Sequence, residues 1–224
     1  MRSMRTAARA LLLLSSSAML AAALAGPARA QRHNTVSFEE GEEGWYPLFD
    51  GRGIDGLVPA GAAEWQVRDG QIVAESGGMG LLLTDDTFSD FELRVDFLAA
   101  PGTNSGIFLR MTTQDLLAGG RAYELNIAPP DTPFPTGSVM HVEIAPGGGA
   151  PQFGAAHKAE GAGESDDWRT FHVVVNGGRI MVTLDGERLA ELDDPSPIPE
   201  GYIGLQHNQG NVAFRNVKVR RLRL

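Results

Sequence analysis

Residues 171–192 read FHVVVNGGRIMVTLDGERLAEL and have the pattern of two successive β-hairpins. Three short apolar or alternating runs are divided by Asn176-Gly-Gly178 and by Asp185-Gly186. Asn-Gly and Asp-Gly suit tight hairpin turns because the central residues of those turns adopt positive φ values. The segment therefore predicts three antiparallel strands joined by tight turns.

The same organisation extends over most of the chain. Asp69-Gly70 divides two further runs, at 64–68 and 71–75. Other strands are expected at 80–84, 90–98, 105–111, 122–127, 138–144, 202–206 and 211–220. After residue 30 no stretch has a sustained helical period, and 112–118 has room for one or two turns only. About a dozen short strands predict an all-β fold, a two-sheet antiparallel sandwich or jelly roll, with a barrel as the alternative.

Residues 1–30 have the features of an export signal. Arg2, Arg5 and Arg9 precede an apolar stretch, and Ala28-Arg-Ala30 is a small-x-small cleavage site. The apolar stretch is too short and Ala-rich for a good membrane span. We expect cleavage near Ala30, a periplasmic or secreted location, and no membrane anchor in the mature chain. Residues 31–43 are polar and predict a flexible acidic leader, so the domain is expected at 44–224.

The composition excludes several classes of protein. The whole chain has 19 Lys and Arg against 28 Asp and Glu, and four of the arginines lie within the signal, which leaves a mature formal charge of 15 − 28 = −13. Such a chain has no broad basic surface for nucleic acid. It has no cysteine, so disulfides and thiolate metal sites are excluded and stability must come from the core.

Polar side chains alternate with apolar ones on three of the predicted strands. Asn104-Ser-Gly-Ile-Phe-Leu-Arg110, Tyr123-Glu-Leu-Asn-Ile127 and Tyr202-Ile-Gly-Leu-Gln206 each have one apolar and one polar face. If the strands share a sheet, the polar faces form a groove suited to a sugar; the alternative is an ordinary solvated sheet face. The side chains assigned to this groove are Asn104, Arg110, Glu124, Asn126 and Gln206, with His207 at the rim.

The chain resembles a known family through an ordered set of short motifs. In order along the chain, these motifs are Leu48-Phe-Asp-Gly51, Ile54-Asp-Gly56, Trp65 with Asp69-Gly70, Asp90-Phe-Glu-Leu93, Asn104-Ser-Gly-Ile107 with Arg110, Tyr123-Glu124, Trp168, Gly204-Leu-Gln206 and Val212-Ala-Phe-Arg-Asn-Val217. The succession, from about Trp45 to the C-terminus, resembles the 3-keto-disaccharide hydrolase family. The resemblance implies a concanavalin A-like jelly roll, export, and action on sugars oxidised at C3.

Two positions depart from the family pattern. Leu57 stands where the family usually has a tryptophan, and the chain reads His207-Asn-Gln-Gly210 where the family often has His-Gly. The second departure leaves His207 in a shifted role.

The implied chemistry needs one base. A ketone at C3 acidifies the proton on C2, so a base can remove it, the C1 leaving group departs by elimination, and hydration completes a net hydrolysis. Glu124 is the expected base, Arg110 the group that holds the enolate oxygen or the sugar, and His207 a third catalytic candidate. Asn104, Asn126 and Gln206 are expected to bind substrate. The alternative roles are a surface carboxylate for Glu124 and a structural ion pair for Arg110.

Other functions stay open on the sequence. A non-catalytic, lectin-like carbohydrate-binding module of the same fold is the first alternative, and a structural envelope domain is the second. His141 and Glu143 lie on one face of a predicted strand and could contribute to a metal site, but spacing places no third ligand. We therefore expect a small-molecule carbohydrate as the partner and no cofactor or metal.

Overall fold

The computed structural model describes residues 33–147, 151–159 and 165–222. The predicted signal peptide lies outside the described residues. The elements of the first half are α1 (Phe38–Glu42), β1 (Tyr46–Pro47), β2 (Leu57–Arg68), β3 (Gln71–Phe88), β4 (Phe91–Ala99), β5 (Asn104–Met111) and β6 (Gly120–Ile127). Those of the second half are β7 (Val139–Ile144), β8 (Gln152–His157), β9 (Arg169–Asn176), β10 (Arg179–Leu184), β11 (Glu187–Asp193), β12 (Gly201–Gln209) and β13 (Val212–Arg221).

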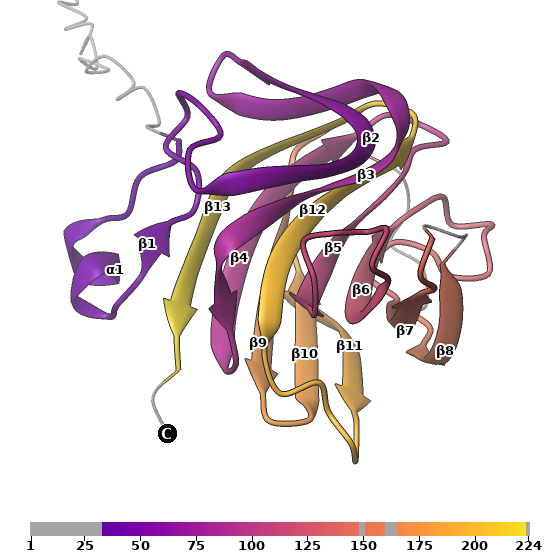
Figure 1. Ribbon diagram of the computed structural model, residues 1–224. Helices are drawn as coiled ribbons and strands as arrows, with labels where there is room; N and C mark the ends of the chain where they lie inside the picture. Colours follow the sequence, from indigo (N-terminus) through magenta and orange to yellow (C-terminus); the bar gives the residue numbers. More distant parts are fainter. Residues whose placement is uncertain (1–32, 148–150, 160–164, 223–224) are drawn as a thin grey trace, which may run out of the picture. The chain divides into compact units, whose positions relative to one another are not determined.

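The strands form one strongly curled antiparallel sheet that folds into two layers (Figure 1). Its order is β11-β10-β9-β4-β13-β3-β12-β5-β6-β7-β8, while β1 pairs with β13 and β2 with β3. We call β12, β5, β6, β7 and β8 the front layer, and β11, β10, β9, β4 and β13 the back layer. The predicted all-β antiparallel sandwich is confirmed.

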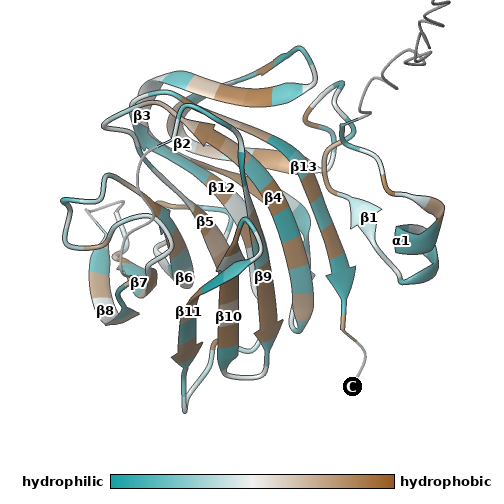
Figure 2. Ribbon diagram, turned by 180° about the vertical axis from the view of Figure 1, so that it is seen from behind, coloured by the Kyte–Doolittle hydropathy of each residue, from teal (hydrophilic) through white to brown (hydrophobic). Residues whose placement is uncertain are grey.

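The main core lies between the two layers. Alternate residues of the strands point into it, so that β4 and β13 are banded with hydrophobic and hydrophilic residues (Figure 2). Phe91, Phe97 and Phe171 are contributed by the back layer, and Tyr123 and Leu205 by the front layer. This burial, with no disulfide to assist it, is the main source of stability.

Strand β3 belongs to both layers. Its first part, around Ile72–Ala74, pairs with β13, and its second part, from Gly80 onward, pairs with β12. β2 runs beside almost the whole of β3 as a long hairpin, from Leu57 opposite Thr84 to Arg68 opposite Gln71. The hairpin turn is Asp69-Gly70, both residues with positive φ, as the sequence predicts.

A second apolar cluster covers the side of the front layer that faces away from the core, which we call the front face. The cluster comprises Leu81, Leu83, Phe108, Met111, Leu116, Ala122, Val142 and Ile144. Leu116 comes from the β5–β6 loop, residues 112–119, and packs onto strands that would otherwise be solvated. The front face is therefore partly a buried surface.

The described part of the expected flexible leader, residues 33–43, is folded onto the domain, so that expectation is wrong. Ser37 begins α1 with a capping box, in which it exchanges hydrogen bonds with Glu40. Glu40 then forms ion pairs with Arg94 and Lys218. Asn34 exchanges hydrogen bonds with Asn216, both between a backbone N–H and a side-chain oxygen, at 2.7 and 2.8 Å. In the described residues no helix is long and apolar enough to cross a membrane.

Candidate functional site

The front-face cluster and the described residues that pair with it across the strands include one carboxylate, that of Glu124. It lies on β6 opposite Phe108 of β5 and Met140 of β7, and only 3% of its surface is exposed. Burial raises the pKa of Glu124 to about 7, and a hydrogen bond from the Gln206 side chain opposes the shift. A carboxyl group with this pKa is suited to exchange protons near neutral pH.

Gln206 lies beside Glu124 and shares its unusual environment. The cross-strand pairs Gln206–Gly106 and Gly106–Asn126 place Gln206 on the same face as Asn126 and Glu124. Oε2 of Glu124 and Oε1 of Gln206 are both buried without a hydrogen-bond partner. Two buried acceptor oxygens without donors are costly, and a ligand that presents hydroxyl groups would satisfy both.

Gly106 makes room for the Glu124 carboxylate. A Cβ atom at this position would lie 3.0 Å from Oε1 and 3.2 Å from Cγ of Glu124. The glycine of the Asn104-Ser-Gly-Ile107 motif therefore has a direct packing role beside the candidate base.

The two asparagines differ in how far they are engaged. Asn126 is buried on the front face, and its Nδ2 donates to the carbonyl oxygen of Phe134 in the β6–β7 loop. Asn104 is half-buried at the start of β5, on the same face as Gly106 by alternation. The structure thus brings Glu124, Asn126 and Gln206 together, with Asn104 at the end of the same face.

Arg110 does not join this group, so the prediction that it shares the face of Glu124 is wrong. Its guanidinium donates to the carbonyl oxygens of Ser89, Gly177 and Ile198 at 2.6, 2.8 and 2.7 Å. It also forms an ion pair with Asp90 at 2.9 Å, and the residue is 1% exposed. Burial lowers the pKa of Arg110, and the Asp90 carboxylate opposes the shift. Arg110 ties strand ends together within the fold.

A β-bulge explains why alternation fails at Arg110. Phe108 pairs with Gly204 and Met111 with Tyr202, so β5 advances three residues while β12 advances two. The extra residue is Arg110, whose φ is +56°. Met111 consequently takes the front-face position that strict alternation assigns to Arg110.

The sequence predicts that His207 is accessible at the rim of the groove, and this prediction is wrong. His207 follows Gln206 and so points to the opposite side of β12. Only 2% of the surface of His207 is exposed. Its Nδ1 lies 3.2 Å from the carbonyl oxygen of Gly78, and its Nε2 lies 3.0 Å from the carbonyl oxygen of Gly210. His207 therefore fastens the β2–β3 hairpin to the β12–β13 turn.

The raised pKa of Glu124 predicts a pH-dependent stability. Between the ordinary value of 4.5 and the folded value of about 7, the folded protein retains a proton that the unfolded chain has lost. The contribution of this group to the free energy of unfolding therefore falls as pH rises through this window and is constant above it. Glu124→Gln should be more stable than wild type by on the order of 3 kcal/mol at about pH 8, and similar to it at about pH 4.

Urea unfolding of both proteins at the two pH values measures this difference. Glu143→Gln is the matched control, because Glu143 is an exposed carboxylate on the neighbouring strand β7. An equal pH dependence of wild type and Glu124→Gln would contradict the assigned environment of Glu124.

A second polar cluster, which the sequence did not indicate, lies between the layers beside β7. Asp194 accepts from the Tyr123 hydroxyl at 2.6 Å and from the Ser196 backbone N–H at 2.8 Å, and it pairs with His141 Nε2 at 3.2 Å. Burial, followed by the hydrogen bond to Asp194, raises the pKa of Tyr123 to about 12. Burial acts to raise the pKa of Asp194, but the hydrogen bonds from the Tyr123 hydroxyl and the Ser196 backbone N–H outweigh it, so the pKa of Asp194 is lowered. Alternation places Tyr123 in the core correctly but cannot show which loop reaches it.

His141 of this cluster lines a cavity of about 430 Å³ that Phe153, Arg121, Glu143 and Gln152 also line. Cross-strand pairing places these last three side chains next to one another on the side of β6, β7 and β8 opposite the front face. Among the described residues, no group of three His, Cys, Asp or Glu could hold a metal ion.

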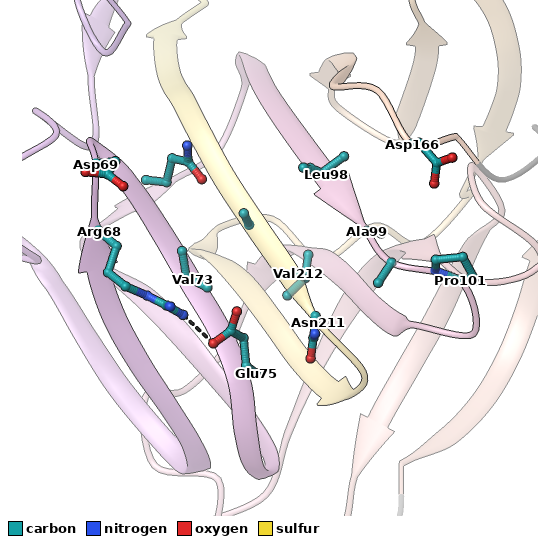
Figure 3. A pocket seen from close by; sticks show the side chains of 13 residues that line it. Arg68, Asp69, Val73, Glu75, Leu98, Ala99, Pro101, Asp166, Asn211 and Val212 are labelled. Atoms are coloured by element: carbon teal, nitrogen blue, oxygen red, sulfur yellow. Dashed lines mark hydrogen bonds and ion pairs between the residues drawn. The ribbon is translucent and has the colours of Figure 1, made fainter.

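A groove of about 410 Å³ lies elsewhere, over β3, β13 and β4 (Figure 3). Val73, Leu98 and Val212 contribute to its apolar lining, and Arg68 and Glu75 form an ion pair at its edge. The groove holds none of the residues that the sequence assigned to the site. The Arg68–Glu75 pair is exposed, and Asp69 and Asp166 also line the groove.

Residues 44–220 match the family described as the 3-keto-alpha-glucoside-1,2-lyase-like domain. The chain belongs to this family. The match spans the whole front layer, including the Tyr123-Glu124 and Gly204-Leu-Gln206 motifs, and it confirms the resemblance seen in the sequence.

Solved structures share the fold of this family member. A putative glycosyl hydrolase from Parabacteroides distasonis has a TM-score of 0.62 and 19% identity, covering 85% of this chain and 100% of that one. A second putative glycosyl hydrolase from the same organism has a TM-score of 0.57 and 25% identity, covering 80% and 99%. Carbohydrate-binding module CBM66 from Bacillus subtilis has a TM-score of 0.56 and 18% identity, covering 73% and 94%. A comparison with curated proteins gives no match. The chain is therefore carbohydrate-related by family, and it shares its fold with these structures.

Proposed function

We propose that this family member cleaves 3-keto-glycosides and that Glu124 is the general base that removes the C2 proton. The observation that carries the proposal is the pairing of Glu124 with Gln206. Both are buried on the front face, both keep an acceptor oxygen without a donor, and the Glu124 pKa of about 7 suits reversible proton transfer.

The reaction proceeds by elimination and then hydration. Glu124 takes the C2 proton, and the electrons of that bond form an enolate with the C3 ketone. The enolate electrons then expel the C1 oxygen substituent, which takes a proton from solvent. Hydroxide from the same solvent adds to C1, and protonated Glu124 returns a proton to C2. The net result is hydrolysis, and Glu124 is restored.

Gln206, Asn126 and Asn104 are the proposed substrate-binding residues. The Gln206 amide lies next to the base, where it can orient the carboxylate and donate to an oxygen of the sugar. Arg110 has no part in this proposal, because its donors are engaged by Asp90 and three carbonyl oxygens. His207 has none either, since both ring nitrogens face backbone carbonyl oxygens.

The rate effect of a label at C2 tests the proposed chemistry. A 3-keto-glycoside deuterated at C2 should be cleaved several-fold more slowly than the unlabelled compound under single-turnover conditions, because the bond to C2 breaks before the bond at C1. The corresponding glycoside without the ketone should not be cleaved, since its C2 proton is not acidic. Rates of sugar release measure both. Equal single-turnover rates for the labelled and unlabelled compounds would count against elimination and favour direct displacement at C1.

The second candidate is a carbohydrate-binding module without catalytic activity. The observation that favours it is the near-complete burial of Glu124, together with the likeness of the fold to CBM66. Binding of unoxidised glycosides with no turnover of any 3-keto-glycoside would support this function over the enzyme. In either case we propose that the signal at residues 1–30 exports the protein, which then meets its sugar in the periplasm or outside the cell.

A further inference from the structure

The front face continues from Glu124 toward an exposed aromatic side chain at the edge of the sheet. Phe153 of β8 is 50% exposed, and with Phe38 and Leu117 it makes up the large hydrophobic residues exposed to this degree in the described part of the chain. A large exposed aromatic beside a polar site indicates a contact surface for a ligand.

Strand register places Phe153 on the same face as the candidate base. Phe153 pairs with Val142 of β7, and Val142 pairs with Ala122 of β6. Directly opposed residues of antiparallel strands point to the same face, and both Val142 and Ala122 belong to the front-face cluster. Ala122 is two residues before Glu124, so the Cα atoms of Phe153 and Glu124 are separated by about 12 Å on the spacing of an ordinary sheet.

A second aromatic side chain connects Phe153 to the amide groups of the site. The rings of Phe134 and Phe153 contact each other with centroids 6.2 Å apart and planes tilted by 44°. The carbonyl oxygen of Phe134 accepts the hydrogen bond from Asn126 Nδ2. Asn126 therefore fixes the backbone of the loop that carries Phe134, beside the strand that carries Glu124.

The two ends of the front face differ in chemistry. The β12 and β5 end has the amide of Gln206 and the unpartnered oxygen atoms, which suit the hydroxyl groups of an oxidised ring. The β8 end has the aromatic pair, which suits the apolar C–H face of a second ring. The separation of about 12 Å between the Cα atoms of Glu124 and Phe153 leaves room for two linked pyranose rings.

We propose that Phe153 and Phe134 form a stacking platform for the leaving group of the substrate, a gluco-configured pyranose attached at C1 of the oxidised ring. This inference rests on the proposed function, because that function places the oxidised ring at Glu124. Phe153 is thus a specificity-determining residue that discriminates by the size and flatness of the leaving group.

Binding of substrates that cannot react tests the platform independently of catalysis. The probes are an unoxidised gluco-configured disaccharide and the matching methyl glucoside, neither of which has the ketone. By isothermal titration calorimetry, Phe153→Ala should lower the affinity for the disaccharide about tenfold and leave the affinity for the methyl glucoside unchanged. Phe153→Trp should restore the affinity, and Phe38→Ala, which removes another exposed ring, that of α1, should have no effect.

Equal disaccharide affinity of Phe153→Ala and wild type would overturn the platform, provided that the two melt at the same temperature. If Phe153→Ala melts lower, Phe153→Leu replaces it, because leucine keeps apolar contacts but lacks a flat ring. Loss of affinity in a protein that cleaves no 3-keto-glycoside would retain the platform and reject the enzyme. Unchanged affinity in a protein that does cleave them would retain the enzyme and reject the platform.

Discussion

Glu124→Gln should lower kcat for a 3-keto-glycoside by on the order of 10²-fold or more, because the amide keeps the shape of the side chain but cannot accept the C2 proton. KM should change much less, since Gln206 and Asn126 remain to bind the sugar. Steady-state kinetics on the folded variant measure both constants. The loss should appear in kcat and in kcat/KM together, as for a group that acts in the transition state.

Glu143→Gln is the control for this experiment, because it removes a carboxylate of the same sheet from the opposite side of β7. It should retain wild-type kinetics. For the wild-type protein we expect kcat/KM to rise with pH through about 7 as Glu124 loses its proton, and this limb should be absent from the residual activity of Glu124→Gln. Wild-type turnover by Glu124→Gln would refute Glu124 as the base.

The largest loss of stability is expected at Arg110. Arg110→Met removes the partner of Asp90 and leaves three carbonyl oxygens, those of Ser89, Gly177 and Ile198, without this donor. Breaking a buried pair in this way leaves an uncompensated charge, so the free energy of unfolding should fall by about 3–5 kcal/mol. Arg110→Lys should also destabilise, because an ammonium group cannot reach four acceptors in the planar arrangement of a guanidinium.

Arg68→Met is the matched control, since Arg68 also forms an ion pair with a carboxylate but is exposed, as is its partner Glu75. That substitution should cost no more than about 1 kcal/mol. Urea unfolding compares the two variants. Arg110→Met with wild-type stability would contradict the structural role of Arg110. If the folded fraction of Arg110→Met has the same kcat as wild type, Arg110 contributes to stability and not to catalysis.

The sequence predicted the shared face of those candidate site residues that depend on regular alternation. Glu124, Asn126 and Gln206 lie on unbroken stretches of strand, so the two-residue period gave their common face correctly. Hairpin turns at Asp69-Gly70 and Asp185-Gly186 were found for the same reason, because local φ requirements are visible in the residues themselves.

The sequence failed where geometry depends on contacts between distant segments. The bulge at Arg110 is held by acceptors from three other loops, and nothing within 104–111 indicates an extra residue. The front-face cluster includes Leu116, which comes from a loop without any periodic pattern. The Asp194–His141 pair joins residues 53 positions apart, so only the folded chain reveals it.

The position of β3 in both layers determines how the fold can come apart. Hydrogen bonds along one continuous backbone of 18 residues connect β13 of the back layer to β12 of the front layer. One layer cannot separate from the other without breaking the ladder that joins β3 to β13 or the ladder that joins β3 to β12. The domain should consequently unfold both layers in a single cooperative transition. A destabilising substitution in the back layer should therefore also unfold the strands that carry Glu124.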